Sequence, residues 1–217
     1  YDMSLNTEKQ KLIHAHKYQL WMNKLKLNGL HSIQVDELYS RYNGKGEILF
    51  SLLYTDATTP EGNKIPPICF LKGEVVCVLI CLVDQISKDK YLLLVRQRRI
   101  CDGSMTYEHP AGMLDSEKDA AAVAVREVEE ETGISISKSD LITLNSEAYF
   151  PSTGTSDEAA YFFACELEIT AADIASYHQQ DQGLVSEHEH IQTYVVPFVE
   201  GNKLINNCNG LLMNLLY

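Results

Sequence analysis

The sequence predicts a mixed α/β (α+β) fold, an α/β/α sandwich around a mixed β-sheet. Long apolar runs rich in β-branched residues are typical of buried strands. Helical segments lie between these runs, and the order along the chain is strands, helix, strands, helix. The 217 residues, 45% hydrophobic and 22% charged, are enough for one large domain or one domain with an appendage.

The first elements are a helix and a strand of a small N-terminal subdomain. Residues 6–28 contain helix formers with a weak apolar stripe, and Asn28-Gly29 is a good end signal for a helix. Residues 47–56 are predicted to form a strand, and a turn-rich link follows. We therefore expect residues 1–67 to form an N-terminal subdomain and residues 68–217 to form the main domain.

The main domain is predicted to contain mostly strands around one central helix. Apolar runs or alternating apolar residues predict the strands, and polar segments with Gly, Pro or Ser separate them. The expected strands are 68–84, 91–99, a short strand within 100–112, 140–150, 159–169 and 190–198, and residues 202–217 are expected to form a closing helix kinked at Gly210.

The charge of the chain limits its partners. It contains 18 Lys and Arg residues against 30 Asp and Glu residues, a net charge of -12. Such a chain is not expected to bind nucleic acid or an anionic membrane surface non-specifically. No apolar run approaches the roughly 18 residues of a transmembrane helix.

The six cysteines are scattered without a CxxC pair, and several lie in apolar runs. Buried free thiols are therefore expected instead of disulfides or zinc ligands. This favours a reducing, cytoplasmic compartment. The first residues do not resemble a signal peptide, and the start at Tyr1-Asp2-Met3 leaves an upstream targeting segment open.

The central helix is predicted to run from Glu117 to Thr132. Ser116 and Asp119 have the spacing of a capping box, and Gly133 is a typical C-terminal residue. Apolar residues recur with helical spacing and predict a stripe that packs on the sheet. The stripe consists of Ala121, Ala124, Val125 and Val128.

This helix carries an unusual concentration of carboxylates. Glu127 and Glu131 are one helical turn apart, and Arg126 and Glu130 form a second i,i+4 pair of opposite sign. Like charges at this spacing repel, and a hard divalent cation held by the first pair would offset the repulsion. The alternative is a solvated acidic face, which is what most charge runs on helices are.

The same residues resemble the Nudix box, G-x5-E-x7-R-E-U-x-E-E-x-G-U, in which U is aliphatic. Eight of its nine defined positions match, and Lys118 stands where the pattern has Glu. The matching residues are Gly112, Arg126, Glu127, Val128, Glu130, Glu131, Gly133 and Ile134. Upstream, the chain resembles the Q-x-R and E-x-P-A-G segments of Nudix hydrolases of ADP-ribose and nucleotide sugars, through Gln97, Arg99, Glu108, Pro110 and Ala111.

The resemblance implies a Nudix α/β/α sandwich that depends on Mg²⁺ or Mn²⁺ and cleaves a pyrophosphate linking a nucleoside to another group. It also implies a homodimer whose N-terminal segments contribute to dimerisation and to substrate contacts. The implied metal ligands are Glu127 and Glu131, the carbonyl of Ala111, and Glu130 and Glu108 in supporting positions. The resemblance also implies that Glu127, Glu131 and Arg126 form the catalytic centre.

The remaining site residues follow from the same resemblance. Glu158, in the loop of residues 149–163, is the expected general base, with Asp157 as the second candidate and as a substrate contact. Arg99 is expected to bind a substrate phosphate, because a guanidinium pairs bidentately with phosphate oxygens, and Gln97 is expected to bind substrate beside it.

The activity expected is Mg²⁺-dependent hydrolysis of nucleoside-diphosphate sugars to a nucleoside monophosphate and a sugar phosphate, with ADP-sugars or ADP-ribose preferred. Hydrolysis of UDP-sugars or of another nucleoside-diphosphate-linked substrate is an alternative, because the box itself does not determine specificity. Lys118 prompts a further alternative, a catalytically silent module that binds nucleotides.

Overall fold

The computed structural model describes residues 9–183 and 190–217. The chain divides into two compact units. The first contains Tyr1–Glu74 and Ser152–Ala159, and the second contains Val75–Pro151 and Ala160–Tyr217. Among the described residues, no helix has both the length and the apolar character needed to cross a membrane.

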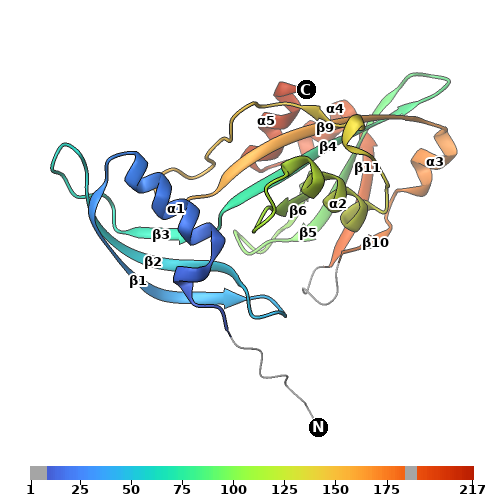
Figure 1. The fold of residues 1–217 in the computed structure, drawn as a ribbon. Coiled ribbons are helices and arrows are strands. Elements are labelled where there is room, and N and C mark those ends of the chain that lie inside the picture. Colours follow the sequence, from blue (N-terminus) through green and yellow to red (C-terminus); the bar gives the residue numbers. More distant parts are fainter. Residues whose placement is uncertain (1–8, 184–189) are drawn as a thin grey trace, which may run out of the picture. The chain divides into compact units, whose positions relative to one another are not determined.

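The first unit is a helix packed on a three-stranded antiparallel sheet (Figure 1). Its elements are η1 (Leu12–His14), α1 (His16–Leu27), β1 (His31–Tyr42), β2 (Ile48–Thr58) and β3 (Ile68–Leu71). Trp21 of α1 is buried in one apolar cluster with Leu53 and Leu71 of the sheet. Burial of these side chains is the main driving force that holds the helix on the sheet.

Two features of this unit differ from the sequence prediction. Helix α1 begins at His16, later than the predicted start at residue 6. It ends at Leu27 with Asn28 as its C-cap, where the sequence predicts the end, and Gly29 follows at φ 84°. The start of that predicted range, residues 6–8, lies outside the described residues. Strand β1 was not predicted, because none of its residues is buried and its sequence lacks an apolar alternation.

The predicted strand 68–84 is two strands, β3 and β4 (Glu74–Asp84). Gly73 separates them with φ 91°, a backbone conformation that glycine adopts without strain. β3 pairs with β2 in the first unit, and the division between the two units falls after Glu74. The roles assigned to residues 1–67 and 68–217 stay predictions.

The second unit is built around an eight-stranded sheet. Its elements are β4 (Glu74–Asp84), β5 (Lys90–Arg98), β6 (Met105–Glu108), β7 (Ala111–Met113), α2 (Ala120–Thr132), η2 (Lys138–Asp140), β8 (Ile142–Thr143), β9 (Ala159–Ile169), α3 (Ala171–Ser176), β10 (Asp181–Gln182), β11 (Ile191–Pro197), α4 (Phe198–Leu204) and α5 (Cys208–Leu216).

The sheet is mixed, as predicted. Its order is β10-β11-β5-β4-β9-β8, with β6 paired to β5 and β7 paired to β4. β4 and β9 run parallel, because hydrogen bonds join them near both ends, from Ala159 N to Gly73 O and from Gln85 N to Ile169 O. The pairs of β4 with β5 and of β5 with β11 are antiparallel.

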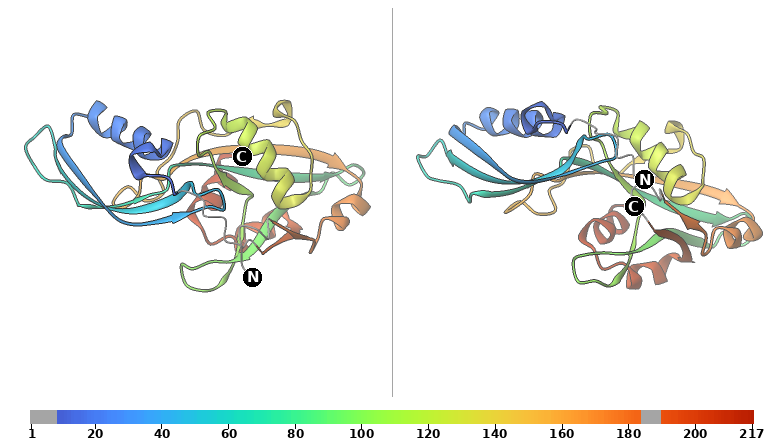
Figure 2. Two further views of the ribbon diagram at one scale, coloured as in Figure 1. Left: turned by 60° about the horizontal axis from the view of Figure 1, so that its bottom comes forward. Right: turned by 90° about the horizontal axis from the view of Figure 1, so that it is seen from below.

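Helices cover both faces of this sheet, which confirms the predicted sandwich (Figure 2). Alternate residues of β5 point to opposite faces. Leu93 packs in the cluster that contains Val123 and Val128 of α2. Leu92 packs in the other cluster with Met213 of α5. The sheet therefore has one core on the α2 side and a second core on the α4 and α5 side.

Two predicted elements of this unit are wrong. In residues 140–150 only Ile142–Thr143 forms a strand, and Tyr149 adds a single bridge to Ala160. The C-terminal helix is interrupted between Leu204 and Cys208 and not at Gly210. A Cβ at Gly210 would lie 2.6 Å from Ile205 Cγ2, so this glycine allows close packing of α5. The sequence predicts only a polar segment where helix α3 lies.

We predict that only the exposed cysteines react quickly in the native protein. Cys77, Cys81 and Cys165 are buried, as expected. Burial raises the pKa of Cys69 to about 12, of Cys81 to about 11 and of Cys165 to about 12. Cys101 and Cys208 are exposed. Iodoacetamide at pH 8, followed by mass spectrometry, should modify these two first and all the cysteines after denaturation, because the thiolate is the reactive form. Rapid native labelling of Cys81 or Cys165 would contradict the prediction.

Candidate functional site

The acidic helix α2 begins later than predicted. Asp119 is its N-cap residue, since its carboxylate accepts a hydrogen bond of 3.1 Å from Ala122 N. The Ser116–Asp119 capping box is therefore wrong. The carboxylate of Glu117 accepts hydrogen bonds from the backbone N–H groups of Lys118 and Asp119 and shapes the turn that enters the helix. The end at Thr132, followed by Gly133 at φ 73°, is as predicted.

The buried face of α2 is rotated slightly from the predicted stripe. Val123, Ala124 and Val128 are buried, whereas Ala121 and Val125 are only half-buried. The buried face extends at the C-terminal end to Glu131, which is 5% exposed, and to Thr132. A carboxylate at that depth needs a hydrogen-bond donor.

Glu131 has such a donor in the short strand β7. The backbone N–H of Ala111 donates to Glu131 Oε2 over 3.0 Å. This hydrogen bond provides the donor that the buried carboxylate needs. The contact also ties the C-terminal half of α2 to the strand that begins at Ala111, so this end of the helix has a defined position on the sheet.

Glu127, one turn earlier, lies directly against Gly112 of the same strand. A Cβ atom at Gly112 would be 2.0 Å from Glu127 Cδ and 2.2 Å from its Oε1, closer than any real contact of a Cβ atom. Only glycine leaves room for the carboxylate at this position. Glu127 and Glu131 thus reach adjacent residues of β7, as their i,i+4 spacing on one helix face allows.

Arg126 forms its ion pair with Glu127, whereas the sequence predicts a pair with Glu130. The distance from Arg126 Nη2 to Glu127 Oε1 is 2.9 Å. Burial lowers the pKa of Arg126, but its hydrogen bond to Glu127 and the negative charges of Glu127, Glu130 and Asp115 outweigh burial and raise the pKa. Arg126 therefore stays charged and partly offsets the repulsion among the carboxylates.

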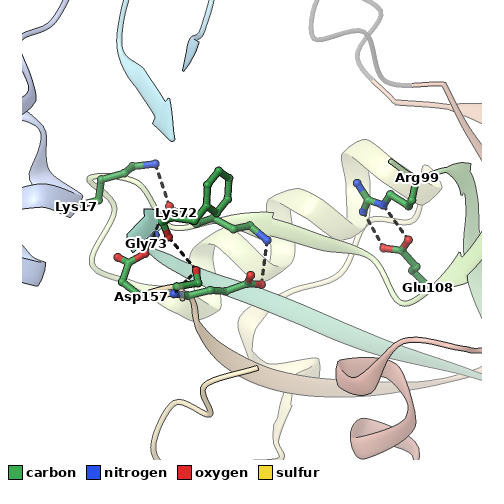
Figure 3. A network of polar contacts seen from close by, with 9 residues as sticks. Lys17, Lys72, Gly73, Arg99, Glu108 and Asp157 are labelled. Carbon is green, nitrogen blue, oxygen red and sulfur yellow. Dashed lines mark hydrogen bonds and ion pairs between the residues drawn. The ribbon is translucent and has the colours of Figure 1, made fainter. Parts of the chain in front are cut away.

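Arg99 and Glu108, predicted to bind phosphate and metal respectively, form an ion pair with each other (Figure 3). The pair is bidentate, with Arg99 Nε 2.8 Å from Glu108 Oε1 and Nη2 2.7 Å from Oε2. Thr106 Oγ1 also donates to Glu108 Oε1 and lies 3.1 Å from the carbonyl oxygen of Gln97. Thr106 links two predicted site residues, and a single threonine in a strand sequence carries no signal that could have identified it.

Asp157 and Glu158 belong to the first unit. Asp157 Oδ1 accepts hydrogen bonds from the backbone N–H groups of Lys72 and Gly73, at 2.7 and 3.1 Å (Figure 3). Burial raises the pKa of Asp157, against these hydrogen bonds and the charge of Lys17. Glu158 Oε1 pairs with Lys72 Nζ at 2.9 Å.

Buried Lys17 supports this segment, since its Nζ donates to Leu49 O and Lys72 O. Neither Lys17 nor Lys72 could be predicted as a neighbour of the loop that carries Glu158, because nothing in the sequence places these lysines near it.

A comparison with known families decides the identity of this arrangement. The sequence profile of the NUDIX domain matches residues 72–200, more than half of the chain. The chain belongs to the Nudix family. Members of this family hydrolyse nucleoside-diphosphate compounds, and the match includes the whole of α2 and β7.

Two known proteins are similar to this Nudix chain, one by sequence and one by structure. It is 37% identical over 147 residues to Nudix hydrolase 14, chloroplastic, of Arabidopsis thaliana, an alignment that covers 64% of this chain and 47% of that protein. The chain spans about half the length of the curated relatives it matches. A crystal structure of an ADP compounds hydrolase superposes with a TM-score of 0.56 at 15% identity, over 84% of this chain and 89% of that chain. This last likeness shows the fold.

Nudix hydrolases in general use a divalent metal ion such as Mg²⁺, and the Nudix residues of this chain fit one. Glu127 and Glu131 reach the same short strand, and carboxylate and carbonyl oxygens are the donors that Mg²⁺ prefers. Within residues 9–183 and 190–217, no three Asp, Glu, His or Cys side chains already form a metal-ligand cluster. Two of the predicted metal ligands are instead paired with arginines, Glu127 with Arg126 and Glu108 with Arg99. The ligand roles stay predictions.

We predict that Gly112→Ala impairs turnover of a nucleoside-diphosphate substrate by about 100-fold with little change in the midpoint of thermal unfolding. The added methyl group would displace the Glu127 carboxylate, which can rotate away without disrupting the core, and a displacement of about 1 Å in a catalytic group has this order of effect. Gly44→Ala is the matched control, because a Cβ there meets no atom within 4 Å. Equal turnover by the two variants would contradict the assignment.

Proposed function

We propose that this protein hydrolyses the pyrophosphate bond of nucleoside-diphosphate sugars in a Mg²⁺-dependent reaction and releases a nucleoside monophosphate and a sugar phosphate. The observation that carries the proposal is the approach of two carboxylates of one helix, Glu127 and Glu131, to Gly112 and Ala111 of β7. Four acidic residues in six positions, with an arginine paired to one of them, suit an electrostatic centre for phosphate chemistry.

In this proposal Glu127, Glu131 and the carbonyl of Ala111 hold the metal, and Glu130 and Glu108 support it. Mg²⁺, or Mn²⁺ in its place, supplies charge that neutralises phosphate oxygens and lowers the pKa of bound water. Arg126 keeps the Glu127 side chain in position through their ion pair of 2.9 Å. The buried position of Glu131 keeps its carboxylate in a fixed orientation.

Arg99 and Gln97 bind the diphosphate of the substrate. The bidentate pair that Arg99 makes with Glu108 shows that its guanidinium presents two parallel donors, which is the geometry that phosphate oxygens also accept. Substrate binding would replace Glu108 as the partner of Arg99. Glu108 would then be available to support the metal, so the two groups are proposed to change partners together.

Glu158 is the proposed general base. Its carboxylate lies 2.9 Å from Lys72 Nζ in an ion pair, and a carboxylate is a group that can accept a proton from water. Asp157 keeps the backbone of Lys72 and Gly73 in place through Oδ1 and is proposed to contact substrate as well.

ADP-sugars, including ADP-ribose, are the preferred substrates in this proposal. The fold likeness to a protein described as an ADP compounds hydrolase supports that choice. UDP-sugars and other nucleoside-diphosphate-linked compounds are the alternative within the same chemistry. A silent nucleotide-binding module is disfavoured, because Glu127, Glu130 and Glu131 are all retained and Lys118, the departure from the box, is exposed in the turn before α2.

The protein is also proposed to be a homodimer through its first unit. The face of the sheet opposite α1 carries Tyr39, Tyr54 and Ile68, which are 59%, 44% and 42% exposed. Tyr54 and Ile68 are directly paired across β2 and β3. Exposed apolar side chains gathered on one face are typical of a surface that contacts another chain.

We predict that Glu131→Gln lowers the hydrolysis of an ADP-sugar by 100-fold or more, on the order expected for loss of an electrostatic group at a catalytic centre. The assay is a panel of ADP-ribose, ADP-glucose and UDP-glucose with Mg²⁺, and it follows the release of phosphate monoester. Glu129→Gln is the control, because Glu129 is exposed and its Oε1 accepts from Ser135 Oγ. No turnover of any compound by the unchanged protein would overturn the proposed function.

We predict that Glu158→Gln reduces kcat by about 100-fold, within the range expected for a general base, and that Lys72→Ala reduces it less. The amide keeps the size of the side chain and removes its basicity. Lys203→Ala serves as the control, since Lys203 forms an ion pair of similar length, 2.8 Å, with Glu200 on α4, at a more exposed position than the Lys72–Glu158 pair. Unchanged kcat in Glu158→Gln, measured with saturating substrate, would exclude Glu158 as the base.

A further inference from the structure

The strand β6 sends alternate side chains to the two faces of the sheet. Thr106 and Glu108 lie on one face, where Thr106 Oγ1 reaches the Glu108 carboxylate. Tyr107 lies on the opposite face, where it packs in the core that contains Met213 of α5. Glu108, which the proposed function places at the reaction centre, is thus flanked by Tyr107 and His109, which contact the side of the sheet that holds the C-terminal helices.

Helix α5 makes hydrogen bonds to both residues that flank Glu108. Asn207 Nδ2, at the N-cap of α5, lies 3.3 Å from the carbonyl oxygen of Tyr107. His109 Nε2 lies 2.9 Å from Asn214 Oδ1, near the end of the helix. Asn207 Oδ1 also accepts from Gly210 N at 2.8 Å, so the side chain that reaches Tyr107 is part of the helix cap.

The direction of the His109 hydrogen bond follows from the third member of this network. Asn214 Nδ2 donates to Asn202 Oδ1 of α4 over 2.6 Å, so Asn214 Oδ1 is the acceptor and His109 Nε2–H is the donor. His109 is 3% exposed. Burial outweighs its hydrogen bonds and lowers the pKa of His109 to about 4, so the ring is neutral near pH 7. A buried donor of this kind has a defined partner and a defined orientation.

We propose that α5 positions the reaction centre from the opposite face of the sheet, and that His109 and Asn214 are positioning residues for Glu108 and Ala111. The inference rests on the proposed function for its kinetic consequences. The segment from Tyr107 to Ala111 carries Glu108 and the N–H group that binds Glu131. Without the contacts to α5, this segment can shift while the core of the sheet stays packed.

The first test replaces the donor and keeps the size of the side chain. His109→Phe removes Nε2–H. We expect it to raise KM for the hydrolysed sugar nucleotide by about tenfold, and to raise the Mg²⁺ concentration for half-maximal activity by about the same factor. Loss of a residue that orients metal ligands has effects of this order. kcat should change much less. Asn214→Ala, which also removes the hydrogen bond to Asn202 Oδ1, should give at least this effect, and the double variant should add little to Asn214→Ala, because both single variants break the His109–Asn214 hydrogen bond. His109→Gln, which keeps a donor, should recover most of the loss.

A second measurement does not depend on activity. Amide hydrogen exchange followed by mass spectrometry, without substrate, should show faster exchange in residues 105–113 of His109→Phe than in the unchanged protein. If the unchanged protein hydrolyses no member of the panel, the proposed function fails, and the exchange result alone decides whether α5 restrains this segment.

Asn145→Ala is the matched control for a general loss of stability. Asn145 is 6% exposed, donates to Ala160 O and accepts from Phe162 N, so it is a buried side-chain amide of the same unit whose hydrogen bonds join residues outside β6 and β7. It should lower the unfolding temperature and leave KM and exchange in residues 105–113 unchanged. Unchanged kinetics and exchange in folded His109→Phe, or the same changes in Asn145→Ala, would overturn the proposal.

Discussion

The site of this protein depends on the close approach of helix α2 to the short strand β7. Glu127 occupies the space that any side chain at position 112 would need, with a Cβ only 2.0 Å from its Cδ. Glu131 receives the N–H of the neighbouring Ala111. Val123, Ala124 and Val128 pack the helix in the core, and these two contacts determine where its carboxylates lie beside β7. The positions of the two carboxylates therefore depend on contacts of their side chains with the backbone of β7.

The same contacts explain how one short helix can carry so many acids. Glu127 pairs with Arg126, Glu129 accepts from Ser135, and Glu131 accepts from Ala111. Each of these carboxylates has a separate donor from a different direction, which reduces the repulsion that their spacing creates.

The fold was predictable where burial alone determines structure. β4, β5 and β9 are apolar runs buried on both faces, and their sequences contain the β-branched and aromatic residues that such strands need. β1 was missed because it is exposed and is held by pairing with β2. Residues 140–150 alternate like a strand, but mostly form irregular chain between η2 and β9.

By itself, the sequence determined the Nudix family, the mixed sandwich and the residues of the acidic helix, because these depend on spacing along the chain and on local periodicity. Only the tertiary structure decided which charged side chains form ion pairs with one another. Arg126 pairs with Glu127 instead of Glu130, Arg99 with Glu108, and Lys72 with Glu158. The choice among nearby charges depends on side-chain direction and on contacts between residues distant in sequence, such as those of α5 with β6, which no local pattern encodes.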